Sequence, residues 1–324
     1  MRPVAACKSQ NRVPDFFIVG HPKSGTTALF EMLQQHPQIY MPDNKEPWFF
    51  ASELRYRTPP RPSGTPQTLE DYLSLFDAAR PEQRIGEATP LYLWSRTAAS
   101  RIAEVQPAAR IIAILREPAS FLRSLHLQFV QTYVETEADF RKAISLEEAR
   151  REGLHIPRYS YWPKALIYSE HVRYVDQLRR YHTQFPPEQM LVLIYDDFRR
   201  DNEKTVRKVL SFLEVDETAS IEVLEANPTV SPRSQLLNEL VHAVGVGRGP
   251  ISHAVKESIK AVTPSGPRRN ALRAVQRSLV FGSPQRPDDG MMRELRGRFK
   301  PEVVALSEYL GRDLVSLWGY DNID

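Results

Sequence analysis

The feature that most constrains the fold is a loop that joins a short apolar run to an amphipathic helix near the start of the chain. The run Phe16–Val19 is rich in β-forming residues, and a helical apolar face begins near Thr26. Between them stands the sequence Gly20-His21-Pro22-Lys23-Ser24-Gly25-Thr26-Thr27. A turn from strand to helix aims backbone N–H groups and the positive end of the helix dipole at one point. The loop 20–27 is therefore predicted to bind an anion of the phosphate type.

The side chains of this loop suit the same purpose. Lys23 supplies a movable positive charge, and Gly20 and Gly25 let the backbone approach an anion closely. Hydroxyl donors come from Ser24, Thr26 and Thr27. A bare G-x-x-x-x-G also occurs in ordinary strand–helix turns, so the well-formed strand and helix on either side carry the prediction.

Beyond the loop, strands alternate with helices. Arg110–Leu115 and Met190–Tyr195 have the composition of buried strands. Helices are predicted from Pro118, over Tyr168–Tyr181 and over Asp201–Leu213. This alternation favours an α/β fold with a central parallel sheet flanked by helices. We expect a single domain over residues 1–324, with an α/β nucleotide-binding core at 14–215 and a mainly helical C-terminal extension at 216–324.

Composition excludes several classes of protein. The 43 Lys and Arg against 40 Asp and Glu leave a net charge of +3, which argues against a nucleic-acid-binding protein that relies on bulk positive charge. Cys7, the single cysteine, cannot form an internal disulfide or a thiolate metal cluster. No apolar run approaches the roughly 18 residues that span a bilayer. We expect a cytoplasmic protein with no metal and no membrane span.

The loop departs from the pattern of nucleoside triphosphatases. That pattern places Lys directly after the second Gly, whereas here Thr26 follows Gly25 and Lys23 comes two residues before it. The strand at 110–115 is followed by Arg116, where a magnesium-binding Asp is expected. A cation at that place favours direct binding of an anion. A P-loop kinase or triphosphatase therefore remains only as the alternative.

Several segments resemble the family of PAPS-dependent sulfotransferases, where PAPS is 3′-phosphoadenosine 5′-phosphosulfate. Residues 22–27, Pro-Lys-Ser-Gly-Thr-Thr, resemble the family's 5′-phosphosulfate loop, and Arg116-Glu117-Pro118 with Ser124 resembles its 3′-phosphate motif. Residues 45–50 (Lys-Glu-Pro-Trp-Phe-Phe) and 87–93 (Glu-Ala-Thr-Pro-Leu-Tyr-Leu) are similar to segments of the heparan-sulfate-modifying branch and its bacterial relatives. Residues 310–314, Leu-Gly-Arg-Asp-Leu, shortly before Trp318, fit bacterial members. The matches follow the family's order along nearly the whole chain.

The resemblance implies transfer of a sulfuryl group from PAPS to an acceptor hydroxyl, with PAP as the desulfated product. Lys23 would stabilise the leaving phosphate, and Glu46 would be the general base. The implied donor-binding residues are Pro22, Lys23, Ser24, Gly25, Thr26, Thr27, Arg116, Ser124 and, from a looser match, Arg233. The acceptor class is left open between a carbohydrate, a lipid and a small natural product.

Other interpretations stay open at this stage. Glu46 could be a surface carboxylate paired with Lys45, and Arg116 could pair with Glu117 or Glu87. Because other branches of the family use a histidine as base, the reserve candidates are His21, His126 and His155, with Glu87 as a second carboxylate. A PAP-binding protein that has lost the chemistry is the non-catalytic alternative.

Overall fold

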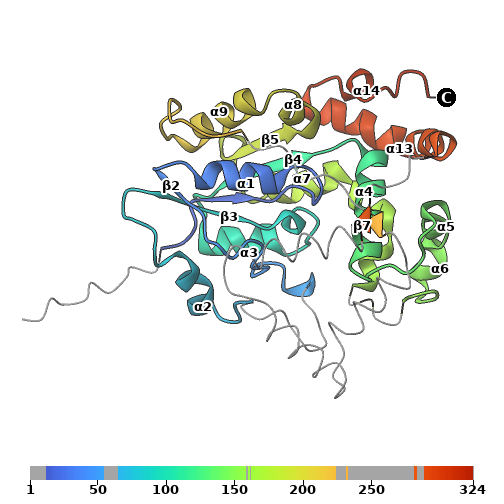
Figure 1. Ribbon diagram of the computed structural model, residues 1–324, viewed down its shortest axis with the longest axis horizontal. Helices are drawn as coiled ribbons and strands as arrows, with labels where there is room; N and C mark the ends of the chain where they lie inside the picture. Colours follow the sequence, from blue (N-terminus) through green and yellow to red (C-terminus); the bar gives the residue numbers. More distant parts are fainter. Residues whose placement is uncertain are drawn as a thin grey trace, which may run out of the picture. The chain divides into compact units, whose positions relative to one another are not determined.

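The computed structural model of the chain describes residues 12–54, 65–157, 160, 162–223, 231–232, 281–282 and 288–323 (Figure 1). The chain divides into two compact units. The first comprises Met1–Phe121, Val172–Asn227 and Phe299–Asn322. The second comprises Leu122–His171, Pro228–Arg298 and Ile323–Asp324.

A five-stranded sheet in the order β2-β3-β1-β4-β5 forms the centre of the first unit. Its strands are β1 (Phe16–Ile18), β2 (Ile39–Tyr40), β3 (Arg84–Ala88), β4 (Arg110–Leu115) and β5 (Met190–Ile194). Every neighbouring pair is parallel, and Ile18 lies opposite Ala88 on one side and Ile112 on the other. The carboxyl ends of β1, β3 and β4 therefore meet at one edge. The predicted parallel α/β sheet is confirmed.

Helices cover both faces of this sheet. Helices α1 (Thr26–Gln34) and α9 (Asn202–Leu213) pack on the face that carries Phe16 and Ile18, where they form one apolar cluster. Figure 1 shows α1 and α9 on one side of the sheet and α3 (Ala98–Val105) on the other. Successive side chains of a strand point to opposite faces, so Phe17 turns away from Phe16 and meets the ring of Phe50 at 5.7 Å. Burial on both faces explains why β4 is almost wholly apolar.

The remaining elements are short, apart from two longer helices. The other α-helices in the described residues are α2 (Leu69–Leu73), α4 (Pro118–Gln131), α5 (Phe140–Ser145), α6 (Glu147–Arg151), α7 (Tyr174–His182), α8 (Tyr195–Arg200), α13 (Asp289–Leu310) and α14 (Leu314–Leu317). Two-residue strands β6 (Ser231–Pro232) and β7 (Phe281–Gly282) pair antiparallel in the second unit. That unit also buries an ion pair of 2.7 Å between Arg150 and Glu135.

The predicted elements differ from the observed ones mainly at their ends. Pro118 opens α4, as its fixed φ favours. Tyr195 begins α8 instead of ending the strand, and the helix expected over Tyr168–Tyr181 is divided into a 3₁₀ segment (Tyr168–Val172) and α7. The helical C-terminal region is confirmed by α13 and α14. The boundary at 215 stays a prediction, and none of the described helices is long and apolar enough to span a membrane.

Candidate active site

The loop after β1 is held against the end of β4. The backbone N–H of Val19 donates to Ile112 O at 2.9 Å, and that of His21 donates to Ile114 O at 3.1 Å. A Cβ on Gly20 would lie 2.5 Å from Ile114 N, while Gly25 has a φ of 86° and lies against the ring of Phe198. The structure shows that these glycines allow close contact with the neighbouring strand and with α8, and their close approach to an anion stays a prediction.

The first backbone N–H groups of α1 have no side-chain cap in the described structure. Gly25 stands at the N-cap position. Thr26 is buried, Thr27 and Pro22 are half-buried, and the buried Ser24 hydroxyl reaches only Pro22 O, at 3.5 Å. Uncapped N–H groups at the positive end of a helix dipole attract an anion. The predicted phosphate-type loop therefore has the expected local geometry.

Two cations meet at this loop. Arg116 Nη1 donates to Lys23 O at 2.8 Å and its Nε donates to Ser120 Oγ at 3.1 Å, while its guanidinium lies 4.9 Å from the centre of the Tyr195 ring. Burial, and then the charge of Arg116, lower the pKa of Lys23. In the described part of the chain, neither cation forms an ion pair with a carboxylate. Two adjacent, partly buried cations create a site that an anion stabilises.

The carboxylates that were alternative partners of Arg116 are engaged elsewhere. Glu117 accepts the backbone N–H groups of Ala119 at 3.0 Å and Ser120 at 2.7 Å. Glu87 accepts the hydroxyl of Tyr72 at 2.8 Å. The guanidinium of Arg116 is thus left to face the loop.

Glu46 lies on a segment attached to the same edge of the sheet. Its backbone N–H donates to Ala88 O at 3.1 Å, at the end of β3, and Ala88 is the register partner of Ile18. Its Oε1 accepts from Lys45 Nζ at 2.9 Å, and the side chain is 37% exposed. The pairing with Lys45 that the sequence left open is therefore present. Its role as a base stays a prediction.

Backbone strain coincides with the two predicted catalytic residues. Lys23 has a φ of 63° and Glu46 a φ of 64°, in the left-handed region that non-glycine residues rarely adopt. Such conformations persist only where the surrounding structure enforces them, and they cluster at functional sites. Trp48, Tyr133, His155 and Glu214 share this conformation, so it supports the two assignments only together with the position of Lys23 and Glu46 at the sheet edge.

Glu87 is buried beneath the segment that carries Glu46. Besides Tyr72, it accepts the hydroxyl of Thr89 at 2.5 Å, and its side chain is nearly inaccessible. Burial raises the pKa of Glu87 to about 7, with a further contribution from the charge of Glu46. The neighbouring Tyr92 hydroxyl accepts the N–H of Phe50 at 3.2 Å. Glu87 is therefore a carboxyl that titrates near neutral pH under the predicted base.

The reserve histidines have structural surroundings. His21 Nε2 lies 2.7 Å from Gln177 Oε1, and its ring stacks on Phe121 at 4.7 Å. His126 is buried in the second unit, where burial lowers its pKa. His155 is exposed, with a φ of 51°.

The structure does not test two of the predicted donor contacts. Ser124 is buried in α4 and belongs to the second unit, so its contact with the donor stays a prediction. Arg233 lies outside the described residues. The sequence did not indicate two tyrosines that contact Arg116. The Tyr195 ring lies against its guanidinium, and the Tyr174 hydroxyl donates to Arg116 O at 2.8 Å. One signal for Tyr195 was available. Tyr195 and Arg116 each follow a buried strand, and the ends of neighbouring parallel strands lie close together.

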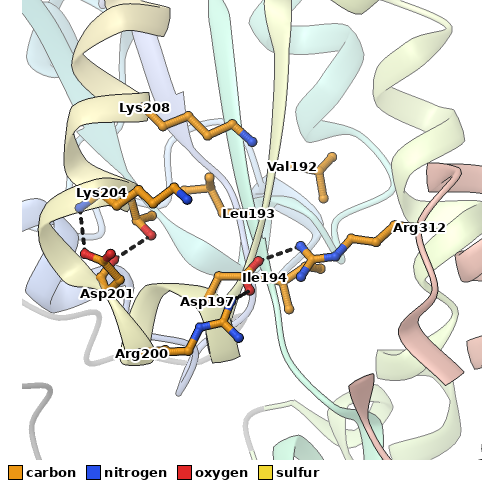
Figure 2. Close-up of a pocket in the computed structure, with 10 residues that line it drawn as sticks. Val192, Leu193, Ile194, Asp197, Arg200, Asp201, Lys204, Lys208 and Arg312 are labelled. Carbon is orange, nitrogen blue, oxygen red and sulfur yellow. Dashed lines mark hydrogen bonds and ion pairs between the residues drawn. The ribbon is translucent and has the colours of Figure 1, made fainter. Parts of the chain in front are cut away.

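A cavity of about 350 Å³ lies at the free edge of β5 (Figure 2). It is lined by Val192, Leu193, Ile194, Asp197, Arg200, Asp201, Lys204, Thr205, Lys208 and Arg312. No predicted donor residue is among them. Lys204 and Lys208 extend from α9 toward this edge strand, where lysines discourage pairing with another chain.

The chain was compared with known proteins. A sequence model of the sulfotransferase family matches residues 14–219. Mouse carbohydrate sulfotransferase 15 is 28% identical over 278 residues, covering 68% of this chain and 47% of the mouse protein. Human heparan sulfate glucosamine 3-O-sulfotransferase 6 is 30% identical over 118 residues, covering 36% of this chain and 31% of the human protein. The chain thus spans about half or less of the length of these curated relatives.

Among solved structures, a sulfotransferase from Alicyclobacillus acidocaldarius has the same fold. It superposes with a TM-score of 0.66 at 26% sequence identity, and the match covers 95% of this chain and 99% of that one. The match extends beyond the α/β sheet to nearly the full length of both chains.

Proposed function

The chain belongs to the sulfotransferase family, and we propose that it transfers a sulfuryl group from PAPS to an acceptor hydroxyl. The observation that carries the proposal is the meeting of Lys23 and Arg116 at the uncapped N-terminus of α1, without a carboxylate partner for either in the described structure. This arrangement suits a ligand that carries two phosphate-type groups.

The donor would be held by two parts of the site. The loop Pro22–Thr27 would bind the 5′-phosphosulfate through backbone N–H groups and hydroxyls. Arg116 would bind the 3′-phosphate, because a guanidinium pairs with a phosphate through two parallel hydrogen bonds. The Tyr195 ring beneath Arg116 keeps one face of the guanidinium from water. Ser124 and Arg233 are proposed as further contacts on the resemblance alone.

In the transfer step, the acceptor oxygen forms a bond to sulfur while the bond from sulfur to the bridging phosphate oxygen breaks. Negative charge grows on that bridging oxygen, and the ammonium of Lys23 would offset it. Glu46 would accept the proton of the acceptor hydroxyl. Lys45, 2.9 Å from Glu46 Oε1, would hold the carboxylate in place. A cytoplasmic location also stays a prediction.

The acceptor is proposed only by class. The matching relatives act, by their names, on carbohydrate and on heparan sulfate glucosamine. A carbohydrate hydroxyl is therefore our first candidate for this chain, ahead of a lipid or a small natural product.

The decisive variant is Lys23→Ala. Purified protein is incubated with labelled PAPS and a panel of carbohydrate, lipid and small-molecule acceptors. If the protein is the proposed enzyme, Lys23→Ala lowers the rate of sulfuryl transfer by on the order of 100-fold or more, while PAP binding persists. Lys204→Ala, a lysine at the β5 edge, is the matched control and retains full transfer.

Two results would favour the alternatives. Wild-type protein that binds PAP but labels no acceptor in the panel indicates a non-catalytic binding protein. Magnesium-dependent turnover of ATP indicates a P-loop kinase or triphosphatase.

A further inference from the structure

The C-terminal segment Arg312–Tyr320 is fastened to α8 within the first unit. Arg312 Nη1 donates to Asp197 Oδ2 at 2.5 Å, a contact that Figure 2 shows. Trp318 Nε1 donates to Asp196 Oδ2 at 2.9 Å, and the indole is buried. Both aspartates lie in the first turn of α8, so the segment fixes the helix where it leaves the sheet.

The same segment also reaches the start of α4. The hydroxyl of Tyr320 donates to Glu117 Oε1 at 2.6 Å, and both residues are buried. The Glu117 carboxylate already accepts the backbone N–H groups of Ala119 and Ser120. Tyr320 thus completes a buried cluster of donors around one carboxylate. A carboxylate held by several hydrogen bonds keeps its orientation.

Each of these two anchors adjoins a group that contacts Arg116. Glu117 follows Arg116 in the chain, and its backbone and carboxylate also hold Ser120, whose Oγ accepts from Arg116 Nε. Asp196 follows Tyr195, whose ring supports the guanidinium. We propose that the segment Arg312–Tyr320 positions Arg116 for the donor's 3′-phosphate, with Tyr320 as the principal positioning residue. This inference rests on the proposed function.

The physical reason is that the Glu117 carboxylate and the donor's 3′-phosphate compete for the guanidinium of Arg116. Burial lowers the pKa of Arg116, and the charges of Tyr195 and Glu117 partly oppose that shift, so the Glu117 carboxylate already attracts the guanidinium. While Tyr320, Ala119 and Ser120 occupy the carboxylate, Arg116 remains available to a phosphate. Without the Tyr320 hydroxyl, the carboxylate has one donor fewer, and we expect the guanidinium of the preceding residue, Arg116, to turn toward it. An internal ion pair would then compete with the 3′-phosphate.

The test is calorimetric titration of Tyr320→Phe with PAP and with AMP, which lacks the 3′-phosphate. We expect PAP affinity to fall about fivefold, the scale of one hydrogen bond, and AMP affinity to stay at the wild-type value. If Tyr320 only stabilised the fold, its loss would weaken the binding of PAP and AMP equally. The ratio of the two affinities therefore reports specifically on the positioning of Arg116. Thermal unfolding of each variant is recorded alongside.

The matched control is Tyr309→Phe. Tyr309 also lies in the C-terminal region, but its hydroxyl meets His182 Nδ1 at 2.6 Å on α7, so its loss should leave the PAP-to-AMP ratio unchanged. If Tyr320→Phe does not fold, Trp318→Phe, which removes the donor to Asp196, provides the same test.

An unchanged ratio in the folded variant overturns the inference. A wild-type protein that does not prefer PAP over AMP overturns the proposed donor instead, so the two failures are distinguishable.

Discussion

The buried carboxyl of Glu87 makes stability depend on pH in a direction opposite to that of most carboxylates. Burial raises the pKa of Glu87 to about 7 in the folded protein, against 4.5 for the free side chain. The folded state therefore holds this proton more tightly than the unfolded state. The stability that the neutral carboxyl contributes is fully present below about pH 4.5 and is lost as the pH rises through about 7.

The size of the effect follows from these two values. A shift of one pKa unit corresponds to roughly 1.4 kcal/mol, so the full effect is about 3 kcal/mol, and roughly 2 to 3 kcal/mol of it falls between pH 5 and pH 8.5. Glu87→Gln keeps the shape and removes the titration. The free energy of unfolding of the wild type minus that of Glu87→Gln should fall by this amount over that range.

The assay is urea unfolding of both proteins at four pH values from 5 to 8.5. Other titrating groups are common to both proteins and cancel in the difference. Glu53→Gln is the control: although burial acts to raise the pKa of Glu53, hydrogen bonds from Ser95, Thr97 and backbone N–H groups together lower it, so its contribution is lost only at lower pH. Its difference from the wild type should be constant over the range. A constant difference for Glu87→Gln as well would refute the reasoning.

Three further predictions concern the loop and the site. Arg116→Ala should lower PAP affinity by about 2–3 kcal/mol, roughly 30- to 150-fold, with little change for AMP, as calorimetry would show; equal losses for both ligands would contradict the assigned contact. Glu46→Gln should lower kcat by roughly 10²- to 10⁴-fold with PAP affinity retained, and an unchanged kcat in steady-state transfer assays would exclude it as the base. Gly20→Ala places a Cβ 2.5 Å from Ile114 N and should cost about 1–3 kcal/mol of unfolding free energy in urea; wild-type stability would show that the loop adapts.

The strands next to the loop could be predicted because burial on both faces leaves a clear sequence signal. β4 was predicted at its observed bounds, since an unbroken apolar run flanked by polar residues leaves little choice. β3 was not predicted as a strand, because Arg84–Ala88 contains a glycine and a glutamate that is buried through hydrogen bonds from Tyr72 of α2 and from Thr89. Its place between β2 and β1 depends on those tertiary contacts.

In the candidate site, too, some residues could be predicted from the sequence and others could not. Lys23 and Arg116 stood out because each follows a predicted strand, and strand ends gather at one edge of a parallel sheet. The platform of Tyr195, the anchor of Tyr320 and the titration of Glu87 depend on contacts between residues far apart in the sequence. No spacing in the sequence indicates such contacts, so only the structure revealed them.

The central claim is that Arg116 and the loop around Lys23 form a site for a donor with both a 5′- and a 3′-phosphate group. Calorimetric titration of the wild-type protein with PAP and with AMP tests it directly and needs no knowledge of the acceptor. We predict that PAP binds on the order of 30-fold or more tightly than AMP, because a phosphate contact to a partly buried arginine contributes about 2 kcal/mol or more. Equal affinities for the two nucleotides would contradict the claim.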